Sequence, residues 1–246
     1  MHKLKVVILT GTKTRHKYFV KIMSEKFNVV GLITEPHSNY FKSQREESLL
    51  VRKHFENLKS SEESYLNSGY DYIDEGLYSN LNYKGLEPKH INDVENIEWV
   101  QSLNPDYILL YGTGILKGEW FKKFEDRIIN LHLGMSPYYR GSATLFWPFY
   151  NNDLEYLGIT IHIATDKVDA GDILHVVKPD IKESDNYYDI TNKLIKKSIN
   201  KLSDTVYSYN EGNIKKIPQD ISEQKYLYKK KDFSEECLKK VLDEWV

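Results

Sequence analysis

The chain has 246 residues, of which 40% are hydrophobic and 28% are charged, as expected for a globular protein with a sizeable core. Its 34 basic and 36 acidic residues give a formal net charge of −2, which excludes a global positive field that would attract nucleic acid. The one cysteine, Cys237, excludes an intrachain disulfide, and no Cys/His set has the spacing of zinc ligands, so no metal is expected.

The first 34 residues predict a strand–helix–strand unit. Residues 4–10 are almost continuous Leu, Val and Ile, as in a strand of a parallel sheet that is buried on both faces. Residues 14–26 have apolar side chains at helical spacing, and residues 28–34 form a second apolar strand. The first run is too short to span a membrane and lacks a signal-peptide cleavage pattern, so we expect a cytoplasmic protein that does not contact membranes.

Residues 35–90 are expected to form an irregular insertion. Residues 49–58 fit one face of a charged helix. Residues 61–89 are rich in Ser, Asn, Tyr and Gly and follow no firm period. We interpret the insertion as a lid or substrate loop, or equally as a plain spacer.

Alternation of strands and helices returns at Asn92. Asn92 and Glu95 resemble a helix-start signal, and Pro105 ends that helix. The later elements are predicted as a strand at 107–111, a turn at 112–114, a helix at 116–124, a strand at 128–133, a loop at 134–142, a helix at 144–150, strands at 157–164 and 173–177, and a helix at about 185–210.

This alternation predicts an α/β fold with a doubly wound, mostly parallel, Rossmann-like sheet. Residues 1–210 are expected to form one domain that includes the insertion at 35–90. Residues 211–246 are expected to form a short C-terminal extension with one extended piece and a charged final helix.

Three polar residues point to acyl transfer onto an amine. Asn130 and His132 end an apolar strand and lie two residues apart, so their side chains point to the same face. Asp169 precedes Ala170-Gly171 in a later turn. An amide donates to an oxyanion, an imidazole polarises or relays a proton, and a carboxylate orients the imidazole or accepts the proton. Taken singly, each residue also has an ordinary reading as a cap, a core histidine or a turn residue.

The motifs around these residues resemble the formyltransferases that use 10-formyltetrahydrofolate. They read Asn-Leu-His-Leu-Gly-Met-Ser-Pro-Tyr-Tyr-Arg-Gly at 130–141, Gly-Ile-Thr-Ile-His at 158–162 and Val-Asp-Ala-Gly-Asp-Ile-Leu at 168–174. That family includes glycinamide ribonucleotide, methionyl-tRNA and sugar N-formyltransferases. The resemblance runs from about Asn104 to about Pro179 and is looser in residues 1–34, and it implies the formyltransferase fold for the domain at 1–210.

The resemblance implies roles for individual residues. Asn130 matches the donor to the formyl oxygen, and His132 matches the residue that polarises the formyl group. Asp169 matches the partner of this histidine and the proton acceptor, and His162 matches a supporting histidine. Cofactor-binding residues are implied in the loop after the strand at 107–111 and in the later Asp turn, namely Tyr111, Gly112, Gly114, Ile115, Leu116 and Asp166.

The acceptor side departs from the purine-pathway enzymes. Their Gly/Ser/Asn-rich first turn is replaced by Thr-Gly-Thr-Lys-Thr-Arg-His at 10–16. A helix start with Lys13, Arg15 and His16 can bind a phosphate or diphosphate, and Arg140 can do the same. The alternative is that a threonine caps the helix, that these basic residues are solvated, and that Arg140 pairs with a surface carboxylate.

The predicted function is formyl transfer from 10-formyltetrahydrofolate to a primary amine, with a nucleotide-linked amino sugar as the favoured acceptor. The residues after Pro179 are too few for the β-barrel domain of the initiator-tRNA enzymes, and the lysines at 229–231 are more typical of a solvated surface than of an RNA site. Nucleic acid is therefore a disfavoured partner. The alternatives are another small amine, methionyl-tRNA, hydrolysis to formate, or folate binding without catalysis. A homodimer is expected only by family analogy.

Overall fold

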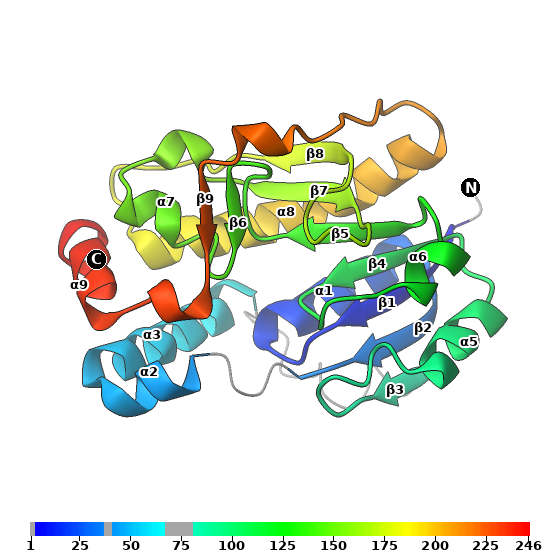
Figure 1. Cartoon of the computed structure of the whole chain (residues 1–246), viewed down its shortest axis with the longest axis horizontal. Helices are drawn as coiled ribbons and strands as arrows, with labels where there is room; N and C mark the ends of the chain where they lie inside the picture. Colours follow the sequence, from blue (N-terminus) through cyan, green and yellow to red (C-terminus); the bar gives the residue numbers. More distant parts are fainter. Residues whose placement is uncertain (1–2, 37–40, 67–80) are drawn as a thin grey trace.

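The computed structural model describes residues 3–36, 41–66 and 81–246 (Figure 1). Seven strands form one sheet in the order β3-β2-β1-β4-β5-β7-β8. The first five strands of this order are parallel, and β7 is antiparallel to both β5 and β8. The strands are β1 (Lys5–Thr10), β2 (Asn28–Thr34), β3 (Tyr83–Gly85), β4 (Tyr107–Tyr111), β5 (Ile128–His132), β7 (Ile159–Ile163) and β8 (Ile173–Val177).

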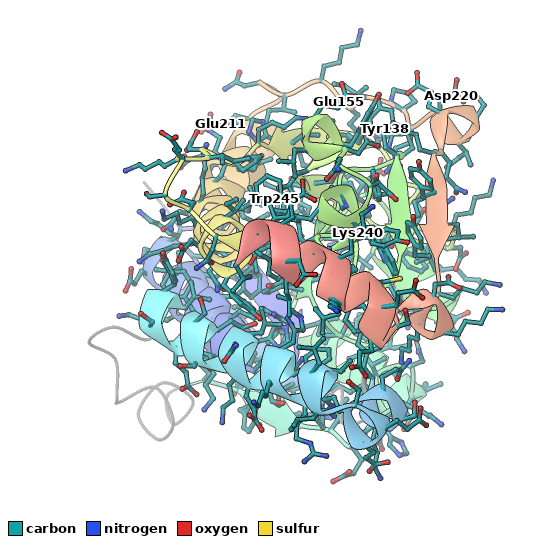
Figure 2. The ribbon with its side chains drawn as sticks, turned by 90° about the vertical axis from the view of Figure 1, so that its left-hand side faces the viewer. Tyr138, Glu155, Glu211, Asp220, Lys240 and Trp245 are labelled. Carbon is teal, nitrogen blue, oxygen red and sulfur yellow. The ribbon has the colours of Figure 1, made fainter. Side chains whose placement is uncertain are left out.

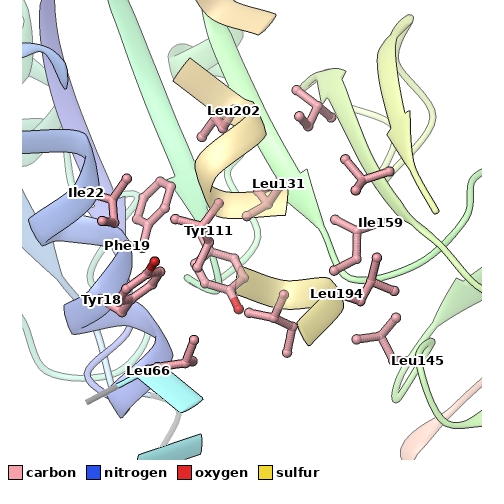
Figure 3. Packing of buried hydrophobic residues seen from close by; sticks show 14 of the residues in the cluster. Tyr18, Phe19, Ile22, Leu66, Tyr111, Leu131, Leu145, Ile159, Leu194 and Leu202 are labelled. Atoms are coloured by element: carbon pink, nitrogen blue, oxygen red, sulfur yellow. The ribbon is translucent and has the colours of Figure 1, made fainter. Parts of the chain in front are cut away.

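Helices cover both faces of the sheet because successive strand residues point to opposite sides. On one face, Val6 and Ile8 of β1 pack with α1 (Thr14–Lys26) and α8 (Tyr187–Asn210), and α3 (Leu49–Leu66) packs outside these two helices. On the other face, Val7 and Leu9 pack with α5 (Val94–Ser102) and α6 (Glu119–Lys123). Figure 3 shows the first layer, where Phe19 packs against Tyr111 at the end of β4.

The segment after α8 returns to pack against β6 (Tyr139–Gly141), α7 (Trp147–Tyr150) and α3. Its strand β9 (Tyr226–Tyr228) pairs with β6 in a separate two-stranded sheet. Its final helix α9 (Glu235–Trp245) packs on α7 and on α3 (Figure 2). Trp147 stacks on Tyr228 with ring centroids 3.8 Å apart. The described residues also form the short elements α2 (Lys42–Glu47), η1 (Leu154–Tyr156), η2 (Ile221–Glu223) and η3 (Lys230–Asp232).

The predicted α/β class and sheet are confirmed, and β1, β2, β4, β5, β7 and β8 lie within two residues of their predicted bounds. The predicted irregularity of 61–89 is wrong at both ends, while residues 67–80 lie outside the described ranges. The helix α3 continues to Leu66, and β3 adds an edge strand. The end of α3 was missed because its buried face does not consist of apolar residues alone. Glu62 in this stretch is a buried acid that forms an ion pair with Arg15, so the apolar spacing of a helix is interrupted.

Four other predicted bounds are corrected. The helix expected at 144–150 begins at Trp147. The helix expected from residue 116 begins at Glu119, because Gly118 has a φ of +40°. The helix expected from Asn92 begins at Val94, and the Asn92 side chain instead bonds the Ile115 carbonyl and the Lys117 N–H, each at 2.9 Å. The loop expected at 134–142 contains β6. Within the described ranges, no helix combines the length and apolarity needed to cross a bilayer.

Candidate active site

The candidate site lies at the edge of the sheet where β1, β4 and β5 end. The chain order of the sheet reverses between β1 and β4, and open α/β sheets form ligand sites at such switch points. A cavity of about 690 Å³ opens there. It extends from the loop after β4 to a wall contributed by α3, α8 and the segment before α9.

The three predicted catalytic residues meet in this cavity. Asn130 and His132 lie on the same side of β5, and Asp169 lies in the loop between β7 and β8. The Asp169 Oδ1 atom is 3.4 Å from His132 Nδ1 and 3.5 Å from Asn130 Nδ2. All three residues line the cavity, so a single bound group can contact them together.

His162 fixes the orientation of the Asn130 amide. It pairs with Asn130 across β5 and β7 and is 1% exposed. Its Nδ1 lies 2.8 Å from the Ile163 carbonyl oxygen, which can only accept, so Nδ1 donates and Nε2 is left to accept from the Asn130 amide. Asn130 Nδ2 is 3.0 Å from that Nε2. One amide hydrogen of Asn130 is therefore held by His162, and the other faces Asp169 through a long contact.

The Asp169 loop depends on one tight turn. Asp169 itself has a φ of +51°, a conformation that Asp adopts more readily than most residues. Gly171 follows, and a Cβ atom there would lie 1.9 Å from the Ile163 carbonyl oxygen. Glycine at 171 thus lets the loop return close to the end of β7, which brings the Asp169 carboxylate to His132.

At pH 7 the site contains a carboxylate beside a neutral imidazole. Burial alone would raise the pKa of Asp169, but the imidazoles of His132 and His162 outweigh burial and hold that pKa at about 2. Burial lowers the pKa of His132, and the Asp169 carboxylate offsets this only in part. The Nε2 atom of His132 is buried and has no hydrogen-bond partner among the described residues. A ligand bound in the cavity can satisfy this atom.

The residues predicted to bind the cofactor divide between two places. Four of them lie in the cavity-lining loop after β4, namely Gly112, Gly114, Ile115 and Leu116. Tyr111 also lines the cavity, but its ring packs against α1 instead of following this loop. Asp166 lies outside the cavity lining, and its carboxylate accepts a hydrogen bond from Gly118 N at 3.0 Å. Asp166 therefore supports the start of α6.

A buried carboxylate that gave no sequence signal holds the same loop. Glu35 follows β2 and is 3% exposed. Its Oε2 accepts from Gly114 N at 2.9 Å, and its Oε1 accepts from Ile91 N at 3.0 Å. The Glu35 carboxylate thereby joins the loop after β4 to the segment before α5.

Lys13, Arg15 and His16 line the cavity at the start of α1, and the His16 ring lies against Gly112 of the loop after β4. Arg15 forms an ion pair with Glu62 of α3, whose side chain is 5% exposed. The His16 ring is buried against Tyr111, and its Nδ1 accepts from Lys13 N at 3.1 Å. His16 thus supports the first turn of α1, while Lys13 and Arg15 bring two positive charges to the cavity.

Arg140 lies outside the cavity lining and braces the catalytic loop. Its Nη2 donates to the Val168 carbonyl at 2.7 Å, and its Nη1 donates to Gln224 Oε1 at 2.9 Å. The Arg140 charge also contributes to the lowered pKa of Asp169. The segment after α8 therefore helps to hold Asp169 in place.

An aromatic wall closes the cavity on the side of α3 and α8. It consists of Phe41, His54, Phe55, Phe146, Tyr187 and Phe233. Phe233 is central, with ring centroids 4.7 Å from Phe41 and 5.0 Å from Phe146. Sequence reasoning missed this wall, because its members come from five separate segments. The local signals were three predicted helices that contain some of its members: His54 and Phe55 at 49–58, Phe146 at 144–150 and Tyr187 at about 185–210.

His54 should make the stability of the fold sensitive to acid. Burial lowers its pKa from 6.5 to about 4, so between these values the unfolded chain binds a proton that the folded chain excludes. Lowering the pH from 7 to 5 should therefore cost about 2 kcal/mol of unfolding free energy through His54 alone. Urea unfolding at both pH values should show this loss in the wild type and a correspondingly smaller loss in His54→Gln.

The matched control for His54→Gln is His90→Gln. A hydrogen bond to Asp93 raises the pKa of the exposed His90, so this residue adds stability at low pH. In His90→Gln, the unfolding free energy should therefore fall more steeply between pH 7 and pH 5 than in the wild type. An unchanged pH dependence in His54→Gln would contradict the assignment of a neutral, buried His54.

No three His, Cys, Asp or Glu side chains of the described residues gather as a metal-ligand set.

Residues 4–206 match the family described as formyl transferase. A methionyl-tRNA formyltransferase from Bacillus velezensis is 34% identical over 142 residues, which are 57% of this chain and 44% of that protein. The chain thus spans less than half the length of the curated relatives that it matches first.

Solved structures share the fold along nearly the whole chain. The formyltransferase PseJ from Anoxybacillus kamchatkensis, in complex with UDP-4,6-dideoxy-4-formamido-L-AltNAc and tetrahydrofolate, is 19% identical, with a TM-score of 0.54 over 98% of this chain and 93% of that chain. A sugar N-formyltransferase from a Shewanella species is 15% identical, with a TM-score of 0.60 over 94% of this chain and 78% of that chain.

Proposed function

Because the chain belongs to the formyl transferase family, we propose that it transfers a formyl group from 10-formyltetrahydrofolate to the primary amine of a nucleotide-linked amino sugar. The observation that carries this proposal is the meeting of Asn130, His132 and Asp169 in one cavity. The cavity is lined by the glycine-containing loop after β4, by Lys13 and Arg15 at the start of α1, and by the aromatic wall. The loop suits a formyl donor, and the cationic and aromatic residues suit an acceptor.

Asn130 and His132 act on the formyl oxygen. 10-Formyltetrahydrofolate supplies a formyl group that becomes negatively charged at oxygen when an amine attacks its carbon. The second amide hydrogen of Asn130, which makes only the 3.5 Å contact with Asp169, is available to this oxygen. The vacant Nε2 of the neutral His132 ring accepts or relays a proton beside it.

Asp169 acts on the proton of the attacking amine. Its carboxylate is ionised at pH 7 and lies beside both Asn130 and His132. A carboxylate with a pKa of about 2 is a weak base, so Asp169 stabilises the positive charge that develops on the attacking nitrogen and passes its proton on without retaining it at pH 7. The bond between the formyl carbon and the folate nitrogen that carried it then breaks, and tetrahydrofolate leaves with a proton on that nitrogen. The proton taken from the amine thus ends on the leaving group, and the negative charge of Asp169 is restored for the next turnover.

Glu35 should govern the formyl-donor side without taking part in the chemistry. In Glu35→Gln, one carboxylate oxygen becomes an NH₂ group that faces a backbone N–H, so one hydrogen bond is lost at a cost of about 1–3 kcal/mol. We expect the KM for 10-formyltetrahydrofolate to rise about tenfold, with kcat changed less than about threefold. The exposed Glu87→Gln is the control, and an unchanged KM in Glu35→Gln would contradict the role of this carboxylate.

Several features support a nucleotide-linked acceptor. Lys13 and Arg15 bring positive charge to the cavity, as a diphosphate requires. The aromatic wall offers flat surfaces for a base or sugar. The PseJ structure, which contains a UDP-linked formamido sugar, covers 98% of this chain.

A second candidate is the methionyl group of methionyl-tRNA, because the sequence relatives at 34% identity are methionyl-tRNA formyltransferases. The test combines 10-formyltetrahydrofolate with UDP- and dTDP-linked amino sugars or with methionyl-tRNA, and follows formyl incorporation by mass spectrometry. Formylation of a nucleotide sugar supports the proposal. Formylation of methionyl-tRNA alone, or formate release without any acceptor, overturns it.

A further inference from the structure

Tyr111 is a buried tyrosine at the end of β4 whose side chain leaves the sheet toward α1. It is 1% exposed, and its ring lies edge-on to His16 and Phe19 at centroid distances of 5.0 and 5.3 Å. Figure 3 shows the phenol pointing away from β4 into the layer that contains α1 and α8. The loop that follows β4 turns to the other layer, where Leu116 packs with α5 and α6.

The Tyr111 hydroxyl is buried and has no hydrogen-bond partner in the part of the chain that the structure describes. Two other buried tyrosine hydroxyls are paired: Tyr139 donates to Asp153 Oδ2 at 2.9 Å, and the Tyr188 hydroxyl is 2.9 Å from His54 Nδ1. A buried hydroxyl without a partner is costly and rare in folded proteins. Tyr111 nevertheless lines the cavity, so a bound molecule can supply the missing partner.

We propose that the Tyr111 hydroxyl is a specificity-determining group that donates a hydrogen bond to an oxygen atom of the acceptor, either a phosphate oxygen or a sugar hydroxyl. The proposal rests on the proposed function, because it assumes a nucleotide-linked acceptor. The family resemblance implied that Tyr111 binds the cofactor, and this inference assigns it to the other substrate.

The surroundings of Tyr111 favour the acceptor. Its ring contacts the first turns of α1, where Lys13 and Arg15 line the cavity, and the charges of Arg15 and Glu62 act on it. Burial raises the pKa of Tyr111, so its hydroxyl stays protonated and acts as a donor. A hydroxyl donor near the ammonium of Lys13 and near the guanidinium of Arg15, which forms an ion pair with Glu62, suits an oxygen-rich ligand.

The test compares Tyr111→Phe with Tyr139→Phe. Each variant loses one buried hydroxyl, but only the Tyr139 hydroxyl has a protein partner. Without ligand, Tyr111→Phe should keep or raise Tm, and Tyr139→Phe should lower it. By calorimetry, Tyr111→Phe should bind a nucleotide-linked 4-amino sugar about tenfold more weakly and bind 5-formyltetrahydrofolate like the wild type. UDP and dTDP, measured without a sugar, show which oxygen accepts the hydrogen bond. If Tyr111→Phe binds these nucleotides more weakly than the wild type does, the acceptor atom is a phosphate oxygen. If Tyr111→Phe binds only the nucleotide-linked amino sugar more weakly, the acceptor atom is a sugar hydroxyl.

Four results would overturn the inference. A fall in Tm for Tyr111→Phe as large as that for Tyr139→Phe would show that the hydroxyl has a structural partner. If Tyr111→Phe bound the acceptor and 5-formyltetrahydrofolate equally more weakly, the Tyr111 hydroxyl would not be specific for the acceptor. Wild-type affinity of Tyr111→Phe for every acceptor ligand would reject the inference and leave the proposed function standing. Failure of the wild type itself to bind any nucleotide or nucleotide sugar would reject the proposed acceptor and the inference together.

Discussion

Asp169→Asn is expected to reduce kcat by about a thousandfold, because the variant keeps the shape of the side chain and loses the charge that accepts the amine proton. The carboxylate is held ionised, with a pKa of about 2, and lies 3.4 Å from His132 Nδ1. Asparagine places a neutral amide there, which cannot accept the proton or stabilise a protonated His132. Formyl transfer to the acceptor under saturating substrates measures the effect.

A second readout separates this role from a loss of structure. The Asp169 carboxylate raises the pKa of His132 against the effect of burial, so Asp169→Asn should shift the His132 pKa further down in an NMR titration. Asp180→Asn is the matched control, since its exposed carboxylate pairs only with Lys197 among the described residues. Turnover of Asp169→Asn within a few-fold of the wild type would refute the proposed chemistry.

The sheet was predictable because its strands are buried on both faces. Residues 5–10 and 107–111 are almost entirely apolar, and such runs have few other readings in a chain of this length. The pairing of Asn130 with His132 was equally local, since two residues of one strand must share a face. The partnership with Asp169 was supplied by the family resemblance, because it depends on the register of β5 and β7 and on the turn at Gly171.

The acceptor side was less predictable because its contacts join distant segments. Arg15 was predicted to bind phosphate, but its ion pair with Glu62 depends on how α3 packs on α1. Arg140 was assigned to the same task, yet it bonds Val168 and Gln224, which become neighbours only when the segment after α8 returns along β6. Long-range contacts of this kind have no periodic signature in the sequence.

Asn130→Ala is expected to lower kcat roughly 100- to 1000-fold, which corresponds to about 3–4 kcal/mol of lost stabilisation of the developing oxyanion. The reason lies in the two hydrogens of the Asn130 amide. His162 Nε2 holds one of them at 3.0 Å and so fixes the amide plane. The other makes only the 3.5 Å contact with Asp169 and can turn to the formyl oxygen as negative charge develops there.

The division between kcat and KM tests whether Asn130 acts on the developing charge. A donor that strengthens its bond only as the charge appears should change kcat and leave KM nearly constant. Asn213→Ala, at an exposed asparagine that bonds Glu211, is the control for the amide truncation. Asn130→Ala could instead raise the KM for the formyl donor and leave kcat unchanged. The amide would then bind the formyl donor only in the ground state, and His132 would have to stabilise the oxyanion.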